Sequence, residues 1–138
     1  MADAVTSQTI IDTEKRVVMK FTNLSDGNGE AAVKKVDVSA LTAHPDGTAC
    51  SQVTIDQIWY DIGGMRVALE WNASSNVVAI VLGGSAAAGN VHGHMDFRSF
   101  GGIKNNAGGG INGDIDLTTN GHTNLDHYTI VLELRKSY

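Results

Sequence analysis

The chain has 138 residues, of which 42% are hydrophobic and 18% are charged, and its net charge is −5. This length and composition are typical of one globular domain with its own hydrophobic core, so we expect a single domain over residues 1–138. The acidic balance and the absence of Lys- and Arg-rich runs argue against nucleic acid as a partner, because such binding needs clustered cations to neutralise phosphates.

The sequence also gives no indication of a membrane or of export. The longest apolar run, residues 77–82, has six residues, whereas a membrane-spanning helix needs about 20. The N-terminal segment lacks the basic start and apolar stretch of a signal peptide. Cys50 is the only cysteine, so no disulfide forms within the chain. We therefore expect a protein that is made and kept in cytosol-like conditions.

Short runs rich in β-branched and aromatic residues follow one another along the chain, separated by Gly, Asn and Asp. The 16 glycines and the single proline suit turns, and no segment has helical periodicity. Small-residue loops are expected at 83–90 and 101–110. The expected strands span, in chain order, residues 8–23, 32–38, 53–61, 65–71, 77–82, 92–100, 111–118 and 126–135.

The most regular pattern lies at 65–71, where apolar side chains alternate without a break from Met65 to Trp71. We predict that this run and 53–61 form a β-hairpin that turns near Gly63-Gly64.

Trp59, Tyr60 and Trp71 then lie on adjacent arms of the hairpin. Such an aromatic cluster forms either the centre of a sandwich core, which we expect, or a platform for a sugar.

About eight strands at spacings of roughly 10 to 15 residues favour an all-β fold, an antiparallel β-sandwich or barrel of jelly-roll-like form. A parallel α/β fold would need crossover helices between the strands, and none is visible.

One histidine-rich segment has the spacing of a candidate metal site. His92, His94 and Asp96 alternate on an expected strand and so project to one face, and His122 or the Asp126-His127 pair can add ligands. One interpretation is a zinc or iron site with His92, His94 and His122 as the first candidates. The other is a polar face turned to solvent or to a partner. The remaining ligands would come from distant segments, so we expect no metal and no cofactor.

Other chemistry has weaker signals, and we expect no catalytic residues and no enzyme activity. There is no Gly-x-Ser-x-Gly elbow. Cys50, with His44 upstream, is expected to be a small residue in or near the core. The 101–110 segment does not match a phosphate-binding loop, and we interpret it as a flexible or closely packed turn. Asp114 and Asp116 alternate on a strand and are expected on a solvated face.

Three blocks of sequence resemble small virion structural proteins of tailed bacteriophages. They are VVMKFTN at 17–23, the WY…GMRV…W pattern at 59–71, and GGI…GHT…YTI between 101 and 130. The resemblance implies a protein that is made in the host cytoplasm and resides in the virion, as a capsid decoration (cement) protein or a neck, tail or baseplate component. Its implied partners are other copies of itself, in a trimer or hexamer, and major capsid or tail proteins. No functional residue is carried over.

We therefore expect a non-enzymatic virion structural protein. One alternative is a carbohydrate- or receptor-binding β-module, which needs the aromatic residues of the 53–71 region to be exposed. Another is a cupin-like metal enzyme, which needs His92, His94 and His122 to converge inside a barrel.

Overall fold

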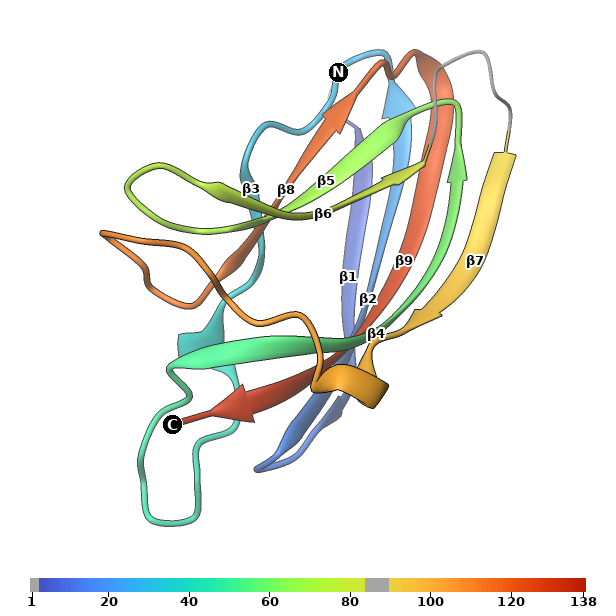
Figure 1. Cartoon of the computed structure of the whole chain (residues 1–138). Helices are drawn as coiled ribbons and strands as arrows, with labels where there is room; N and C mark the ends of the chain where they lie inside the picture. Colours follow the sequence, from blue (N-terminus) through green and yellow to red (C-terminus); the bar gives the residue numbers. More distant parts are fainter. Residues whose placement is uncertain (1–2, 84–89) are drawn as a thin grey trace.

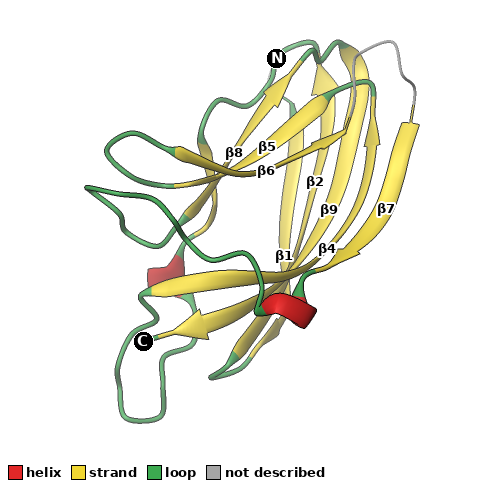
Figure 2. Ribbon diagram, in the orientation of Figure 1, coloured by secondary structure: helices red, strands yellow, loops and turns green. Residues whose placement is uncertain are grey.

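The computed structural model describes residues 3–83 and 90–138, which form two antiparallel β-sheets packed face to face (Figures 1 and 2). Two 3₁₀ turns, Val38–Ala40 and Arg98–Phe100, are the helical elements of this part of the chain. Its strands are β1 (Ala4–Asp12), β2 (Arg16–Asp26), β3 (Val33–Val36), β4 (Gln52–Gly63), β5 (Arg66–Trp71), β6 (Val77–Gly83), β7 (Asn90–Asp96), β8 (Ile115–Asn120) and β9 (Asn124–Ser137).

The strand order identifies the fold as a jelly roll. One sheet has the order β1-β2-β9-β4-β7 and the other has the order β3-β8-β5-β6. With β1 set aside as an added edge strand, β2 to β9 form two facing four-stranded sheets, and only the β5–β6 connection stays within one sheet. This is the double Greek key of jelly rolls. The predicted all-β sandwich of jelly-roll-like form is confirmed, and the sheets do not close into a barrel.

The predicted hairpin over 53–71 is wrong. β4 pairs with β7 and β9, whereas β5 pairs with β6 and β8, so the two arms lie in opposite sheets. Alternation shows which side chains face the core, but two strands that face each other across a sandwich alternate as regularly as two paired strands. Gly64 permits the crossing: its φ is +79°, and a Cβ there would lie 2.2 Å from the Asp126 carboxylate.

The single strand expected over 8–23 is in fact the β1–β2 hairpin, which raises the count from about eight to nine strands in the described residues. The turn between β1 and β2 contains neither Gly nor Pro, the residues that usually mark a turn in sequence. Instead the Thr13 hydroxyl accepts a hydrogen bond from the Arg16 amide at 3.1 Å and donates one to the Arg16 carbonyl at 3.2 Å. The expected 92–100 strand also ends early, at Asp96.

The core lies between the sheets and receives the inward positions of both. Trp71 is fully buried in its centre, but Trp59 is 37% exposed. The expectation that the aromatic residues of 59–71 share the core therefore holds for Trp71 and is wrong for Trp59. The largest fully buried side chains are Trp71, Tyr128, Phe21, Ile55, Ile58, Ile62, Met65, Leu69, Ile115, Leu117, Ile130 and Leu132.

We predict that Trp71→Ala lowers the free energy of unfolding by roughly 3 to 5 kcal/mol, because it leaves a large cavity between the sheets. Trp59→Ala is the matched control and should lower it by less than about 1 kcal/mol, since the outer face has no cavity to form. Urea unfolding followed by circular dichroism measures both. Equal losses for the two variants would contradict the core assignment.

Candidate functional site

The outer face of the five-stranded sheet carries the most distinctive group of unburied side chains. Along β4, Ile58 and Ile62 point into the core, so Trp59 and Asp61 point outward. The strand register sets Trp59 between His94 of β7 and Val131 of β9.

The same register sets Asp61 between His92 of β7 and Thr129 of β9. Two cross-strand rows therefore run side by side, one aromatic and apolar and the other polar.

The Trp59 side chain is held in place by stacking. Its indole lies on the His94 imidazole, with ring centroids 4.9 Å apart and an interplanar angle of 9°. His94 Nε2 is 2.8 Å from Gln57 Oε1, and Gln57 Nε2 donates to Glu133 Oε1 at 3.0 Å. Because Gln57 and Glu133 are buried, this chain of contacts fixes one face of the indole and leaves the rest of the ring available.

A shallow depression of about 260 Å³ lies beside the indole. Tyr60 and Gly93 form its floor through their backbone, since both alternate with the outward positions. The Trp59 and Val131 side chains bound it on one side, and the polar row of Asp61, His92 and Thr129 bounds the other. His94 does not line the depression, so the depression adjoins the part of the indole that His94 leaves uncovered.

The three polar side chains of the depression have no partner elsewhere in the described residues. Asp61, His92 and Thr129 make neither a side-chain hydrogen bond nor an ion pair within residues 3–83 and 90–138. A carboxylate, an imidazole and a hydroxyl are therefore free to receive or donate hydrogen bonds to a ligand. The arrangement is suited to binding, with an apolar ring on one side and, on the other, polar groups that have no partner within the described residues.

The prediction that Trp59 lies in the core is wrong, although the sequence also carries a signal for its exposure. Trp59 and Tyr60 are adjacent on one strand, so their side chains must point to opposite faces. Ile58 and Ile62 lie two residues before and after Tyr60, so all three side chains point to the core side of the strand and Trp59 points outward.

The residues considered as candidate metal ligands are only partly brought together. His92, His94 and Asp96 do lie on one exposed face of β7. Asp96, however, is held by Arg98, whose Nε and Nη2 donate at 2.9 and 2.7 Å. Those hydrogen bonds lower the pKa of Asp96 to about 2.

His122 lies elsewhere, with its Nδ1 3.3 Å from Thr119 Oγ1 on the other sheet. Among the described residues no group of three or more His, Cys, Asp or Glu side chains is placed to hold a metal. A cupin-like enzyme needs its histidines to converge inside a barrel. His92 and His94 instead face outward from an open sandwich, so they do not form such a site.

Cys50 is buried at the edge of the core, as expected. Its Sγ donates to the Gln52 carbonyl at 3.2 Å, and burial raises the pKa of the thiol, which favours the unreactive protonated form. His44 contacts Asp46 and the Tyr138 ring instead of Cys50.

The expectation that Asp114 and Asp116 form a solvated face is wrong, since their side chains are almost fully buried. Asp114 pairs with Lys34 at 3.0 Å and accepts the Val38 amide at 2.9 Å. Asp116 accepts hydrogen bonds from Asn72 at 2.7 Å and Asn76 at 3.0 Å. The turn between β5 and β6 reaches the Asp116 carboxylate, and Lys34 and the Val38 amide reach that of Asp114, which strand alternation cannot reveal.

The 101–110 loop packs against the sandwich at particular points, whereas Lys104, Asn106 and residues 108–110 are exposed. Ile103 forms an isolated bridge with Ile55 of β4, and the Ser74 amide donates to the Gly109 carbonyl at 3.1 Å. A Cβ on Gly110 would lie 2.0 Å from the Ser74 hydroxyl, so the loop depends on glycine there. Most of the second expected loop, 83–90, lies outside the described residues.

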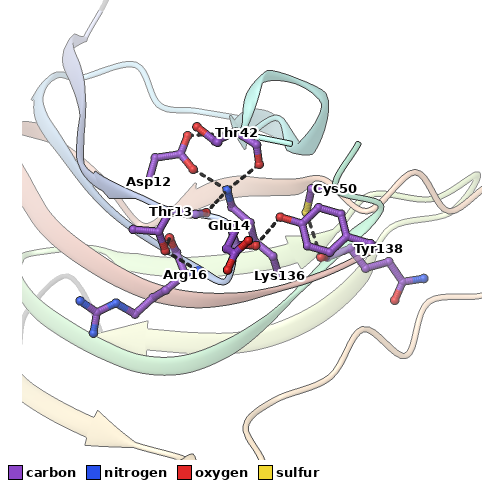
Figure 3. A network of polar contacts seen from close by, with 9 residues as sticks. Asp12, Thr13, Glu14, Arg16, Thr42, Cys50, Lys136 and Tyr138 are labelled. Atoms are coloured by element: carbon purple, nitrogen blue, oxygen red, sulfur yellow. Dashed lines mark hydrogen bonds and ion pairs between the residues drawn. The ribbon is translucent and has the colours of Figure 1, made fainter. Parts of the chain in front are cut away.

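Two buried lysines hold polar clusters at the two ends of β9. At the C-terminal end, the fully buried Lys136 ammonium contacts the Asp12 carboxylate and donates to the carbonyls of Thr13 at 2.6 Å and Thr42 at 2.8 Å (Figure 3). Asp12 also accepts the Thr42 amide at 3.0 Å. Three segments distant in sequence therefore meet at one cation.

At the other end, buried Glu30 joins the two sheets. Its carboxylate accepts from Tyr128 at 2.5 Å and from Asn23 at 2.8 Å in one sheet, and it pairs at 2.5 Å with Lys35 of the other. Burial and the neighbouring Glu30 carboxylate raise the pKa of Tyr128, so the phenol stays protonated. The charged groups of both clusters are paired, although the buried Asn23 Oδ1 has no hydrogen-bond partner in the described residues, and we assign both clusters to stability.

Comparison of the chain with protein-family models, with curated protein sequences and with solved structures finds no match. Within residues 3–83 and 90–138, no helix has the length and apolar character to span a bilayer.

We predict that Asp12→Asn destabilises the protein more at neutral than at acid pH. Burial raises the pKa of Asp12, but hydrogen bonds from Lys136 and Thr42 and the Lys136 charge outweigh it and hold this pKa below the ordinary 3.8. A lowered folded-state pKa gives stability that is present above pH 3.8 and is lost as the pH falls through the folded value. The expected loss at pH 6 is about 3 kcal/mol.

Urea unfolding of both proteins between pH 6 and pH 3 measures this difference, which should shrink toward the acid end. Glu14→Gln, on the exposed turn beside Asp12, is the control and should change little. A loss in Asp12→Asn that is independent of pH would refute the charged pairing.

Proposed function

We propose that this chain is a non-enzymatic structural protein of a tailed-phage particle, a capsid decoration (cement) protein that stabilises the particle by protein–protein contacts. The jelly-roll topology supports the proposal, because viral capsid proteins are among the users of this fold. Lectins and cupins share the fold, so topology alone does not separate the classes. The observation that carries the proposal is the unprotected edge strand β6.

β6 ends the four-stranded sheet, and its outer edge has no strand partner in the described residues. Its sequence, VVAIVLG, holds no charge and no proline. Val78 and Val81 face away from the core and are each 50% exposed, and Ile80 on the other face is only partly buried. Proteins usually protect such edges with Lys, Pro or a covering segment, because an open apolar edge pairs with other chains.

The other edge strands differ from β6. β3 ends the same sheet with the sequence VKKV, and β7 carries two histidines and an aspartate. β1 exposes Val5 and Ile10, but the polar run TSQT lies between them. Among the edge strands of the described residues, β6 is therefore the one with a continuous apolar sequence, which is expected of an edge that is covered in the working state, and strand addition is a common way to cover it.

The occupant we assign to the β6 edge is another copy of this chain. Repeated contacts between identical subunits follow from particle symmetry and turn one weak contact into many. A trimer is the expected assembly for a decoration protein and a hexamer for a ring at the neck or tail. The contact is apolar, so it should resist salt.

We predict that the purified chain forms an oligomer and that Val81→Lys shifts it toward monomer. The substitution places a charge at the centre of the apolar edge without disturbing the core, since Val81 points outward. Leu24→Lys is a matched control, because Leu24 is 49% exposed on the opposite sheet. Light scattering on a gel-filtration column measures the mass of each protein at about 0.1 and 0.5 M salt. The Debye length is about 10 Å at 0.1 M and shorter at 0.5 M, so an electrostatic contact would weaken at the higher concentration.

A wild-type chain that is monomeric at every concentration, or an oligomer that survives Val81→Lys unchanged, would contradict this role of β6.

We further predict that the protein is a stoichiometric component of the particle. Peptide mass spectrometry of purified virions should detect it, and it should remain after a high-salt wash. Particles that lack the chain should lose DNA or break at a lower temperature, because a cement protein bridges capsid subunits. Its absence from purified particles would refute the virion assignment whatever the oligomeric state.

A further inference from the structure

We infer that the depression beside Trp59 is a binding site for the pyranose ring of a neutral sugar. The site lies on the outer face of the five-stranded sheet, whereas the β6 edge belongs to the other sheet. Sugar binding at this site is therefore independent of the proposed structural role, and either one can be refuted without the other.

The aromatic half of the site is prepared for stacking. Trp59 is 37% exposed on the outer face of the sheet, so part of its indole is within reach of a ligand. His94 lies parallel to one part of the indole at 4.9 Å, and the buried Gln57–Glu133 pair holds His94 in turn. An indole that is already fixed loses little conformational entropy when a ligand stacks on it.

The polar half of the site matches the other side of a sugar. A pyranose has apolar C–H groups on its ring faces and hydroxyl groups around its rim. Asp61, His92 and Thr129 form a row two residues along the strands from Trp59, a separation of about 7 Å. Their side chains have no partner in the described part of the chain, so a ligand hydroxyl can displace water from them without breaking a hydrogen bond within the protein.

The shape and charge of the site narrow the ligand class. The depression is shallow and holds about 260 Å³, enough for one ring and too open to enclose a larger molecule. Asp61 brings a negative charge to its rim, and the chain as a whole has a net charge of −5. Both features disfavour sialic acids, uronic acids and phosphates and favour neutral hexopyranosides.

The test is an NMR titration of the ¹⁵N-labelled full-length chain with methyl β-galactoside, methyl β-glucoside, methyl α-mannoside and N-acetylglucosamine. The chain has two tryptophans, one exposed and one fully buried, so its two indole N–H signals act as probe and internal reference. We expect at least one sugar to shift the Trp59 indole signal and those of the depression, with a dissociation constant of about 1 to 10 mM, and to leave Trp71 unchanged.

Variants separate stacking from general surface effects. Trp59→Ala should weaken binding at least tenfold, and Trp59→Phe should restore part of it. Thr129→Val keeps the shape of the side chain and removes the hydroxyl, and should weaken binding about two- to tenfold. Gln8→Ala is the control, because Gln8 lies in the same cross-strand row as Trp59 at the far edge of the sheet.

Two results would overturn the inference. One is that none of the four sugars shifts the Trp59 signal at about 50 mM, well above the expected dissociation constant. The other is that binding persists in Trp59→Ala or is lost equally in Gln8→Ala, which would place the sugar elsewhere on the protein.

Discussion

The last strand of the chain holds the larger sheet together. β9 lies between β2 and β4, and without it the five-stranded sheet divides into β1–β2 on one side and β4–β7 on the other. Figure 1 shows β9 running the length of the sandwich between strands from the first half of the sequence. Its pairing partners are distant in sequence, so the chain must close long loops before those contacts stabilise it.

Buried polar clusters at both ends of β9 explain how so distant a strand finds one register. Tyr128 must reach Glu30 at one end, and Lys136 must reach Asp12 and the carbonyls of Thr13 and Thr42 at the other. A slip of one residue would turn both side chains to the wrong face. It would also leave a carboxylate or an ammonium buried without its partner, which is a large penalty. Against a slip of two residues, which keeps every side chain on its own face, apolar packing alone would discriminate less, because Ile130, Leu132 and Leu134 are similar in size.

The fold class and the inward faces of most strands could be predicted from the sequence, because alternation is a local property of each strand. Pairing is not local. The run from Met65 to Trp71 alternates perfectly, yet it faces β4 across the core instead of lying beside it.

The candidate site was missed for related reasons. A depression formed by β4, β7 and β9 depends on cross-strand register, which brings Asp61, His92 and Thr129 together from three distant segments. The sequence of β4 alone indicates only that Trp59 points outward. Asp114 and Asp116 show the opposite case, since segments distant in sequence engage side chains that local alternation assigns to solvent: Lys34 and Val38 for Asp114, and the β5–β6 turn for Asp116.

A sandwich of two sheets leaves limited places for function, because the facing surfaces are filled by the core. What remains are the outer faces, the edges and the loops. In this chain the two most distinctive surface features divide between the sheets, with the apolar edge at β6 on one and the Trp59 depression on the other. Covering β6 with another subunit would leave the depression open, since Trp59, Asp61 and His92 lie on strands of the opposite sheet. Repetition would then matter for both roles, because an assembly that multiplies the β6 contact also multiplies the exposed depressions. A site that binds one sugar ring at millimolar strength becomes effective when many copies face the same surface.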